Sequence, residues 1–307
     1  MTSERGGRRF EGRVAVITGA GRGLGRAYAE LLASLGAKVM VNDIGAALAG
    51  EGMDSTPAEE TVAAIAAAGG EAAANYDSVA TPEGGRAIIE AALTRFGRID
   101  VLINNAGNTL FADLAAIAYT DFRRIVDVHL LGAFHVVQPA FRAMRDAGYG
   151  RIVLTGSIGG LYTMPSTVPY AVSKSAMIGL NNAIAIEGAD RGIKSNVILP
   201  GALTRMAEGL DTSQYPPMGP ELVAPAVAWL AHESCTVTGE LYAAVAGRIA
   251  RAFVTETEGV YQPAWTIDDV ARRIDEIRDE SRTWMLHPAE CGFNEHLARS
   301  FAMTGER

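Results

Sequence analysis

Two hydrophobic patterns alternate along the chain. Continuous apolar or β-branched runs predict buried strands at Arg13–Thr18, Lys38–Asn42, Glu71–Tyr76, Ile99–Ile103, Ile152–Leu154 and Ile193–Leu199. Longer stretches with apolar residues at helical spacing predict helices at Gly23–Leu35, Glu59–Ala68, Glu83–Phe96, Asp121–Arg145 and Tyr170–Glu187. Buried strands that alternate with helical crossovers are typical of a parallel sheet covered on both faces. The pattern therefore predicts an α/β fold built on a doubly wound parallel sheet.

The pattern becomes less regular after Pro200. Turn-forming residues at Gly209–Pro220 predict a loop of the kind that lines a cleft. A helix is expected at Glu221–His232, a last strand at Gly239–Val245, and two further helices at Trp265–Arg282 and His287–Met303. We therefore expect a flexible N-terminal arm at residues 1–12, a single α/β domain at residues 13–253 and a helical C-terminal extension at residues 254–307.

Composition excludes several classes of function. The 307-residue chain has a net charge of −8 and a pI near 5.2, which argues against nucleic-acid binding. The two cysteines, Cys235 and Cys291, provide no disulfide framework, and no apolar run is long enough for a membrane span. The basic N-terminus lacks the apolar segment of a secretory signal, and the ending Thr304–Arg307 is unlike a peroxisomal address. We therefore expect a cytoplasmic protein without membrane partners.

A glycine-rich turn directly follows the first predicted strand. It runs from Thr18 to Gly25 and opens a predicted helix, which is the position of a dinucleotide-binding loop. Glycine lets the backbone turn sharply and approach a diphosphate, whose charge then meets the amides and dipole of the helix N-terminus. The residues expected to contact a dinucleotide here are Gly19, Gly21, Arg22, Gly23, Leu24 and Gly25.

The end of the second predicted strand discriminates between two forms of such a cofactor. The Asp43 carboxylate can accept hydrogen bonds from the adenosine ribose hydroxyls, and it would repel a 2′-phosphate. Arg22 favours the opposite choice, because a guanidinium can pair with that phosphate. A carboxylate that faces a phosphate in a partly desolvated site is destabilising. The sequence therefore favours NAD over NADP.

Two other strand ends supply small or polar residues. Asp77 and Ser78 follow the third predicted strand, and Asp77 can either bond to adenine or cap a turn. Asn104, Ala106 and Gly107 follow the fourth predicted strand, where small side chains let a cofactor pass close to the backbone. We expect these five residues to contact the cofactor as well.

Three residues suited to proton transfer lie in the second half of the chain. Tyr170 and Lys174 are four positions apart in a predicted helix, so the phenol and the ammonium share one helix face. Ser157 follows the strand Ile152–Leu154 and can reach the same cleft from the side. A hydroxyl, a phenol and an ammonium that converge suit proton transfer to or from an alcohol or carbonyl oxygen. We expect no metal in this site.

These motifs together resemble those of the short-chain dehydrogenase/reductase family. The matching residues, in family order, are Thr18, Gly19, Gly23 and Gly25, then Asn104–Gly107, then Ser157, then Tyr170 and Lys174. The resemblance implies a Rossmann-type dehydrogenase domain that binds NAD. In that family Tyr170 would be the general base, Lys174 would lower its pKa and bind the nicotinamide ribose, and Ser157 would orient the substrate oxygen.

The same resemblance extends to the region after the sixth predicted strand and to assembly. Pro200 and Gly201 keep the family's Pro-Gly pair, and Thr204 is a candidate partner of the nicotinamide carboxamide. Members of the family usually form dimers or tetramers, so a homodimer or homotetramer is expected. One departure is His129, which stands where the family usually has Asn on a proton route to Lys174. Either the His129 imidazole holds a water on this proton route as the Asn side chain would, or only the helix backbone at this position takes part in the route.

A narrower resemblance is to the (3R)-hydroxyacyl-CoA dehydrogenase unit of peroxisomal multifunctional enzyme type 2. The residues that carry it are Val41–Gly45, Ala74–Ser78, Val128–Leu130, Ser173–Lys174, Ala185–Gly188, Arg205–Met206, Leu222–Pro225, Trp229–Leu230 and His232–Cys235. It implies hydride transfer between NAD(H) and a (3R)-3-hydroxyacyl-CoA, either a fatty or a steroid side-chain thioester. A hydroxysteroid dehydrogenase and a 3-oxoacyl thioester reductase are alternatives for the same cleft. A non-catalytic dinucleotide sensor is disfavoured, because a sensor does not need a proton-transfer set.

Overall fold

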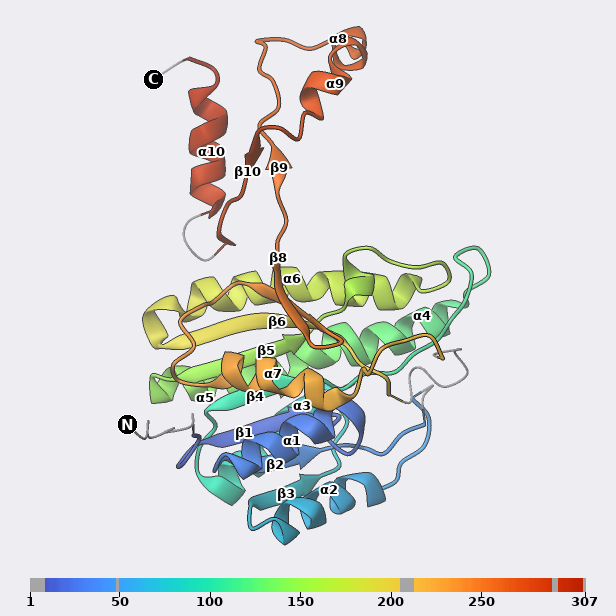
Figure 1. Cartoon of the computed structure of the whole chain (residues 1–307), viewed down its shortest axis with the longest axis vertical. Helices are drawn as coiled ribbons and strands as arrows, with labels where there is room; N and C mark the ends of the chain where they lie inside the picture. Colours follow the sequence, from blue (N-terminus) through green and yellow to red (C-terminus); the bar gives the residue numbers. More distant parts are fainter. Residues whose placement is uncertain (1–8, 48–49, 205–212, 289–291, 306–307) are drawn as a thin grey trace. The chain divides into compact units, whose positions relative to one another are not determined.

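The computed structural model describes residues 9–47, 50–204, 213–288 and 292–305 (Figure 1). The chain divides into two compact units, Met1–Arg251 and Ala252–Arg307. Positions 1–8 of the expected N-terminal arm and 209–212 of the expected loop Gly209–Pro220 lie outside the described residues, as does Arg205–Met206. Of the helices in the described ranges, none is both long and apolar enough to cross a membrane.

One sheet contains eight strands in the order β3-β2-β1-β4-β5-β6-β7-β8 (Figure 1). The strands are β1 (Val14–Thr18), β2 (Lys38–Asn42), β3 (Glu71–Asn75), β4 (Val101–Asn104), β5 (Gly150–Thr155), β6 (Ile193–Gly201), β7 (Leu241–Val245) and β8 (Arg248–Ala252). Strands β1 to β7 pair in parallel. Strand order reverses at β1, which lies between β2 and β4, and a crevice at such a reversal is where ligands bind in open α/β sheets.

Helices cover both faces of this sheet (Figure 1). They are α1 (Gly23–Ser34), α2 (Thr56–Ala67), α3 (Pro82–Phe96), α4 (Tyr119–Val126), α5 (Gly132–Ala147), α6 (Val168–Gly188) and α7 (Ala224–Ala231). Helix α1 packs beside α2 and α7, while α3 packs beside α5. The predicted α/β fold with a Rossmann-like, doubly wound parallel sheet is confirmed.

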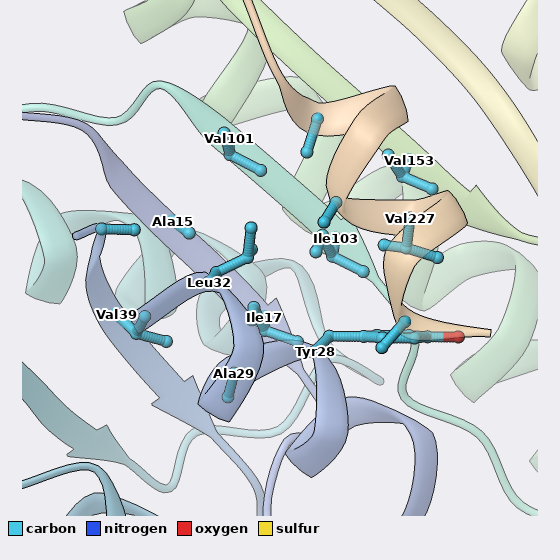
Figure 2. Close-up of a cluster of buried hydrophobic side chains, with 14 of the residues drawn as sticks. Ala15, Ile17, Tyr28, Ala29, Leu32, Val39, Val101, Ile103, Val153 and Val227 are labelled. Atoms are coloured by element: carbon cyan, nitrogen blue, oxygen red, sulfur yellow. The ribbon is translucent and has the colours of Figure 1, made fainter. Parts of the chain in front are cut away.

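Apolar side chains of the sheet and of α1 and α7 form a buried cluster (Figure 2). Ile17 of β1, Ile103 of β4 and Val227 of α7 are fully buried in it. Leu32 of α1 also lies in this cluster, with Tyr28 one helical turn earlier. Burial of apolar surface is the main favourable contribution to folding. It holds the helix α1 firmly on the strand that precedes its glycine-rich loop.

The first unit differs from the predicted elements in two places. The helix expected at Asp121–Arg145 is divided into α4, a π-helical turn at Asp127–Leu131, and α5. Strand β8 was not predicted, because its sequence is interrupted by arginines. It follows β7 through a two-residue turn in which Ala246 and Gly247 have φ values of +48° and +80°. Two consecutive positive values are those of a type I′ hairpin turn.

The second unit contains short elements. Strand β9 (Glu256–Thr257) pairs with β10 (Thr283–Trp284), and the helices are α8 (Ile267–Arg272), α9 (Ile274–Ile277) and α10 (Gly292–Ala302). The single helix expected at Trp265–Arg282 is therefore wrong. Helix α8 begins at a capping box formed by Thr266 and Asp269 and stops at Arg273, whose φ of −105° and ψ of 12° are not helical. Helix α10 is shorter than the predicted His287–Met303.

Candidate active site

The loops that follow β1 and β4 are tied together by hydrogen bonds. The Thr18 hydroxyl accepts from the backbone amides of Asn105 and Ala106, each at 3.0 Å. The Asn105 side chain donates to the carbonyl oxygens of Thr18 at 3.0 Å and Gly19 at 3.1 Å. These bonds hold both loops together at the carboxyl ends of β1 and β4.

Glycine is required where the two loops meet. Gly19 has a φ of +64°, and a Cβ on it would lie 2.8 Å from the Ala106 Cα. A Cβ on Gly25 would lie 2.2 Å from the Gly19 carbonyl oxygen. Helix α1 begins at Gly23, its N-cap Arg22 makes no side-chain cap hydrogen bond, and its first turn has no acidic residue. The backbone amides of this loop and helix end therefore fit the diphosphate of a dinucleotide.

Asp43 joins the end of β2 to the loop after β1. Its Oδ2 accepts from the Gly21 amide at 2.8 Å, and its Oδ1 accepts from the Gly45 amide at 2.7 Å. A carboxylate oxygen has a second lone pair, so each can still accept from another donor. The Arg22 guanidinium lies 3.8 Å from the carboxylate of Asp54. An acidic group is therefore held beside the glycine loop, while Arg22 already has an acidic neighbour.

Asp77 belongs to a side-chain network at the ends of β2 and β3. Its Oδ2 accepts from Asn75 Nδ2 at 2.7 Å. Asn42 Nδ2 donates to Asn75 Oδ1 at 2.8 Å and to the Asp77 carbonyl oxygen at 2.9 Å. The Ser78 hydroxyl accepts from the Ala80 amide at 3.2 Å. One carboxylate oxygen of Asp77 thus stabilises the turn that carries it.

Strand β5 and helix α6 bring the three proton-transfer residues together. The Ser157 Oγ accepts from the Gly159 amide at 3.0 Å, and the Ser157 side chain is hydrogen-bonded to the phenol of Tyr170. One turn further along α6, the Lys174 Nζ lies 5.7 Å from the centre of the Tyr170 ring. It donates to the Thr155 carbonyl oxygen at 2.7 Å. The three side chains expected in one cleft are therefore neighbours.

Burial dominates the electrostatics of this cluster. It raises the pKa of Tyr170, while the hydrogen bond with Ser157 acts in the opposite direction. Lys174 is 6% exposed, and burial lowers the pKa of its ammonium to about 7. That Lys174 lowers the pKa of Tyr170 stays a prediction, since burial and the Ser157 hydrogen bond are the causes that act on the phenol in the chain alone.

His129 lies in the π-helical turn and contacts two parts of the site. Its Nε2 is 3.1 Å from the Asn108 amide nitrogen and 2.7 Å from the Asn108 carbonyl oxygen. Its ring meets that of Tyr170 edge to face, with 5.3 Å between centres. A Cβ on Gly107 would lie 2.5 Å from the His129 Cε1, so glycine is required there. Burial, and then the charge of Lys174, lower the pKa of His129 to about 3, so the imidazole is neutral.

The remaining predicted residues also lie at this edge of the sheet. Pro200 and Gly201 end β6. Thr204 lies beside the glycine loop, because its Cγ2 would be 3.3 Å from a Cβ on Gly23. Leu24 packs against the buried cluster, and Asn104 is buried at the end of β4. In the described part of the chain, no group of three or more His, Cys, Asp or Glu side chains is placed to hold a metal ion.

One buried polar residue of the site, Asn108, is absent from the predicted set. It directly follows Gly107 and is 5% exposed. Its one local feature is that a polar residue immediately follows the small-residue turn Asn104–Gly107, and this feature does not indicate burial. Its burial depends on distant parts of the chain, so the local sequence does not show it.

Comparison with known proteins places this fold and site in a family. Residues 13–214 match the family model described as short chain dehydrogenase. Peroxisomal multifunctional enzyme type 2 of Drosophila melanogaster is 43% identical over 271 residues, which are 88% of this chain and 44% of that protein. A putative short-chain type dehydrogenase/reductase of Mycobacterium tuberculosis is 39% identical over 271 residues, or 88% of this chain and 95% of that protein.

A solved structure gives the same result. The full-length peroxisomal multifunctional enzyme type 2 from Drosophila melanogaster superposes with a TM-score of 0.77 at 35% identity, covering 97% of this chain and 51% of that chain. The present chain therefore spans about half the length of the multifunctional relatives that it matches. The resemblance stated from the motifs is confirmed: the chain belongs to the short-chain dehydrogenase family.

Proposed function

We propose that this protein is an NAD-dependent dehydrogenase that interconverts (3R)-3-hydroxyacyl-CoA and 3-oxoacyl-CoA thioesters. The observation that carries the proposal is the cluster of half-buried Ser157 and Tyr170 with the buried Lys174, at the same edge of the sheet as the glycine loop. The substrate class is supported by the similarity to peroxisomal multifunctional enzyme type 2, and by the motifs in Leu222–Pro225 and His232–Cys235 that resemble its (3R)-hydroxyacyl-CoA dehydrogenase unit.

The family and the fold imply a nicotinamide dinucleotide as the cofactor. Its diphosphate would be held by the amides between Gly19 and Gly25, and its adenosine ribose by the Asp43 carboxylate. Asp43 supports NAD rather than NADP, because a 2′-phosphate would meet a carboxylate that is fixed in place by two backbone amides. When bound, the cofactor supplies hydride transfer to or from the substrate carbon.

The protein contributes the proton chemistry. Tyr170 takes the proton of the substrate hydroxyl during oxidation and returns it during reduction. The Ser157 oxygen already accepts from the Gly159 amide, so its own proton is available for the phenolic oxygen or the substrate oxygen. Near neutral pH Lys174 is partly an ammonium, because its pKa is about 7. As Tyr170 loses its proton, that ammonium stabilises the phenolate.

A steady-state assay at the absorbance of the reduced nicotinamide tests this function. The substrates are both stereoisomers of 3-hydroxyacyl-CoA, acyl-carrier thioesters and free hydroxysteroids, each with NAD and with NADP. We expect the highest catalytic efficiency with (3R)-hydroxyacyl-CoA and NAD. Preference for an acyl-carrier or steroid substrate would establish one of the alternative enzymes, and equal efficiency with NADP would overturn the argument from Asp43. Cofactor binding without any turnover would indicate a sensor.

Tyr170→Phe tests the central residue in the same assay. We expect it to retain cofactor binding and to lose turnover by at least about 100-fold, since general acid–base groups contribute factors of this size. Tyr149→Phe is the matched control, because Tyr149 lies beneath the Arg13 guanidinium, 3.9 Å from its ring centre, at the start of β5 and away from the carboxyl edge. Near-normal turnover of Tyr170→Phe would remove Tyr170 from the mechanism.

Location and assembly belong to the same proposal. A cytoplasmic location is supported by cysteine usage, since Cys235 is free and buried. The multifunctional relatives carry peroxisomal names, so imaging of the tagged chain in its own host is the deciding measurement. A homodimer or homotetramer is supported by the family resemblance, and sedimentation analysis of the purified protein tests it.

A further inference from the structure

Asn108 is a buried side chain with no partner for either polar atom. Its Oδ1 and Nδ2 are both inaccessible to solvent, and neither has a hydrogen-bond partner among the residues that the structure describes. Exchanging the two atoms by a flip of the amide would therefore not satisfy them. A buried unsatisfied amide destabilises a protein by about 1–3 kcal/mol. The backbone of Asn108 is held in place by His129, so the side chain cannot move far to find a partner.

The surroundings of this amide place it at the dinucleotide crevice. The segment after β2 folds back on itself, with the Asp54 amide donating to the Ile44 carbonyl oxygen at 2.9 Å. Within it Gly50 packs on Asn108, since a Cβ on Gly50 would lie 2.6 Å from the Asn108 Nδ2. The next residue, Glu51, forms an ion pair of 2.7 Å with Arg124 of α4.

The strand order shows where the residues that follow β2 lie relative to β1 and β4. Strand β1 lies between β2 and β4. Gly50 and Glu51 follow β2 in the sequence, yet they contact the loop after β4 and helix α4, which belong to the other side of β1. The glycine loop begins at the carboxyl end of β1. The Asn108 side chain thus lies against Gly50, while its backbone contacts His129, whose ring in turn meets that of Tyr170.

We propose that the Asn108 carboxamide hydrogen-bonds a ribose hydroxyl on the nicotinamide side of the bound dinucleotide. A carboxamide has both donors and an acceptor, and a hydroxyl both donates and accepts, whereas a phosphate oxygen only accepts. A ribose hydroxyl can therefore satisfy both orphaned atoms, whereas the diphosphate cannot. The nicotinamide carboxamide also donates and accepts, but it is absent from ADP-ribose, so binding of that ligand tests the ribose contact by itself. The nicotinamide side follows from the bonding of the Asn108 backbone to His129, whose ring contacts that of Tyr170. This inference rests on the proposed function, because it requires the dinucleotide.

The variant Asn108→Leu separates ligand binding from a structural role. We expect the dissociation constants of NADH and ADP-ribose to rise about five- to tenfold, the loss that corresponds to one neutral hydrogen bond. The dissociation constant of ADP, which lacks the second ribose, is expected to stay the same. The melting temperature of the cofactor-free protein is expected to stay equal or rise, because two unsatisfied buried atoms are removed. Should Asn108→Leu not fold, Asn108→Ala is measured in the same way.

Asn181→Leu is the matched control. Asn181 is also buried, and its Nδ2 has no partner in the described residues, but its Oδ1 accepts from the Ser195 hydroxyl of β6 at 2.8 Å. We expect this variant to melt at a lower temperature and to bind NADH as the parent does.

Three results would overturn the inference. A lower melting temperature of Asn108→Leu with an unchanged dissociation constant for NADH would show that the amide only supports the fold. An equal loss for ADP would place the contact on the adenosine side. A parent protein that binds neither NADH nor NADPH would remove the proposed function itself. Failure of the proposed function can be told apart from failure of this inference, because binding of NADH and NADPH is measured on the parent protein before any variant is made.

Discussion

Lys174 illustrates how a functional residue opposes folding. Its ammonium is buried, and burial lowers its pKa from 10.5 to about 7. Between these two pH values the unfolded chain binds a proton that the folded chain does not, so stability rises with pH across this window. Below pH 7 the destabilisation is complete. We expect cofactor-free Lys174→Met to be more stable than the parent near pH 6, by on the order of 2 kcal/mol, with the difference shrinking towards about pH 9.

Thermal melting of the parent and the variant from about pH 6 to about pH 9 measures this difference. Lys194→Met is the matched control, because the Lys194 Nζ also donates to a backbone carbonyl, that of Thr236 at 2.6 Å, but at an exposed position. We expect the Lys194 variant to show a constant difference from the parent. If the difference in stability between Lys174→Met and the parent also stays constant across this pH range, the Lys174 ammonium is fully solvated and the prediction is wrong.

At the scale of elements, the π-helical turn at Asp127–Leu131 contributes to the acid sensitivity of the protein. It buries His129, whose pKa falls from 6.5 to about 3. The unfolded chain therefore binds an extra proton between these pH values, and stability is lost as the pH falls through this range. An Asn amide does not titrate, and it can donate and accept at the same time. We expect His129→Asn to lose less melting temperature than the parent between about pH 7 and about pH 4.5.

His135→Asn is the control for this prediction, because His135 lies on α5 of the same helical run and its Nδ1 is 3.0 Å from the Val79 carbonyl oxygen. Melting curves of the parent and both variants across the acid range give the comparison. If the His129→Asn and parent curves fall in parallel, His129 carries its proton in the folded state as easily as in the unfolded state.

The same turn shows what the sequence could and could not predict about the elements. Strand β2 has the bounds that its apolar run predicts. The neighbourhood of Tyr170 and Lys174 follows from helix geometry alone, because residues four apart share a helix face. The π-helical turn was not predictable, since the amphipathic pattern continues through it. In the structure, His129 of this turn packs closely against Gly107, and these two residues lie far apart in the sequence.

Some residues of the candidate site could be predicted from the sequence, and others could not. Glycines and strand-end residues carry local signals, so the dinucleotide loop and the three proton-transfer residues could be named from spacing. Asn108 could not, because its burial depends on Gly50, which follows another strand. The electrostatics were also beyond the sequence: the effect of burial on Tyr170 and Lys174 depends on the packing around them.

At the scale of the whole molecule, the two units differ in their interiors. The first unit contains the buried cluster of strands, α1 and α7. Among the described residues of the second unit, Gly292 is the one that is buried. Large apolar side chains there are exposed instead, with Ile267 at 88% and Phe293 at 77%. Ordering a residue costs about 1.5 kcal/mol, which buried apolar area must offset.

We therefore expect the fragment 252–307 to be largely unfolded by itself, because it has too little buried apolar surface to fold alone. Far-UV circular dichroism of the fragment should show little helix at α8 to α10 and no cooperative melting. The fragment 1–251 is the comparison, and it should melt cooperatively, since the apolar cluster lies within it. A sharp melting transition of the isolated fragment 252–307 would contradict this expectation. Such a transition would mean that its short strands and helices stabilise one another without a core.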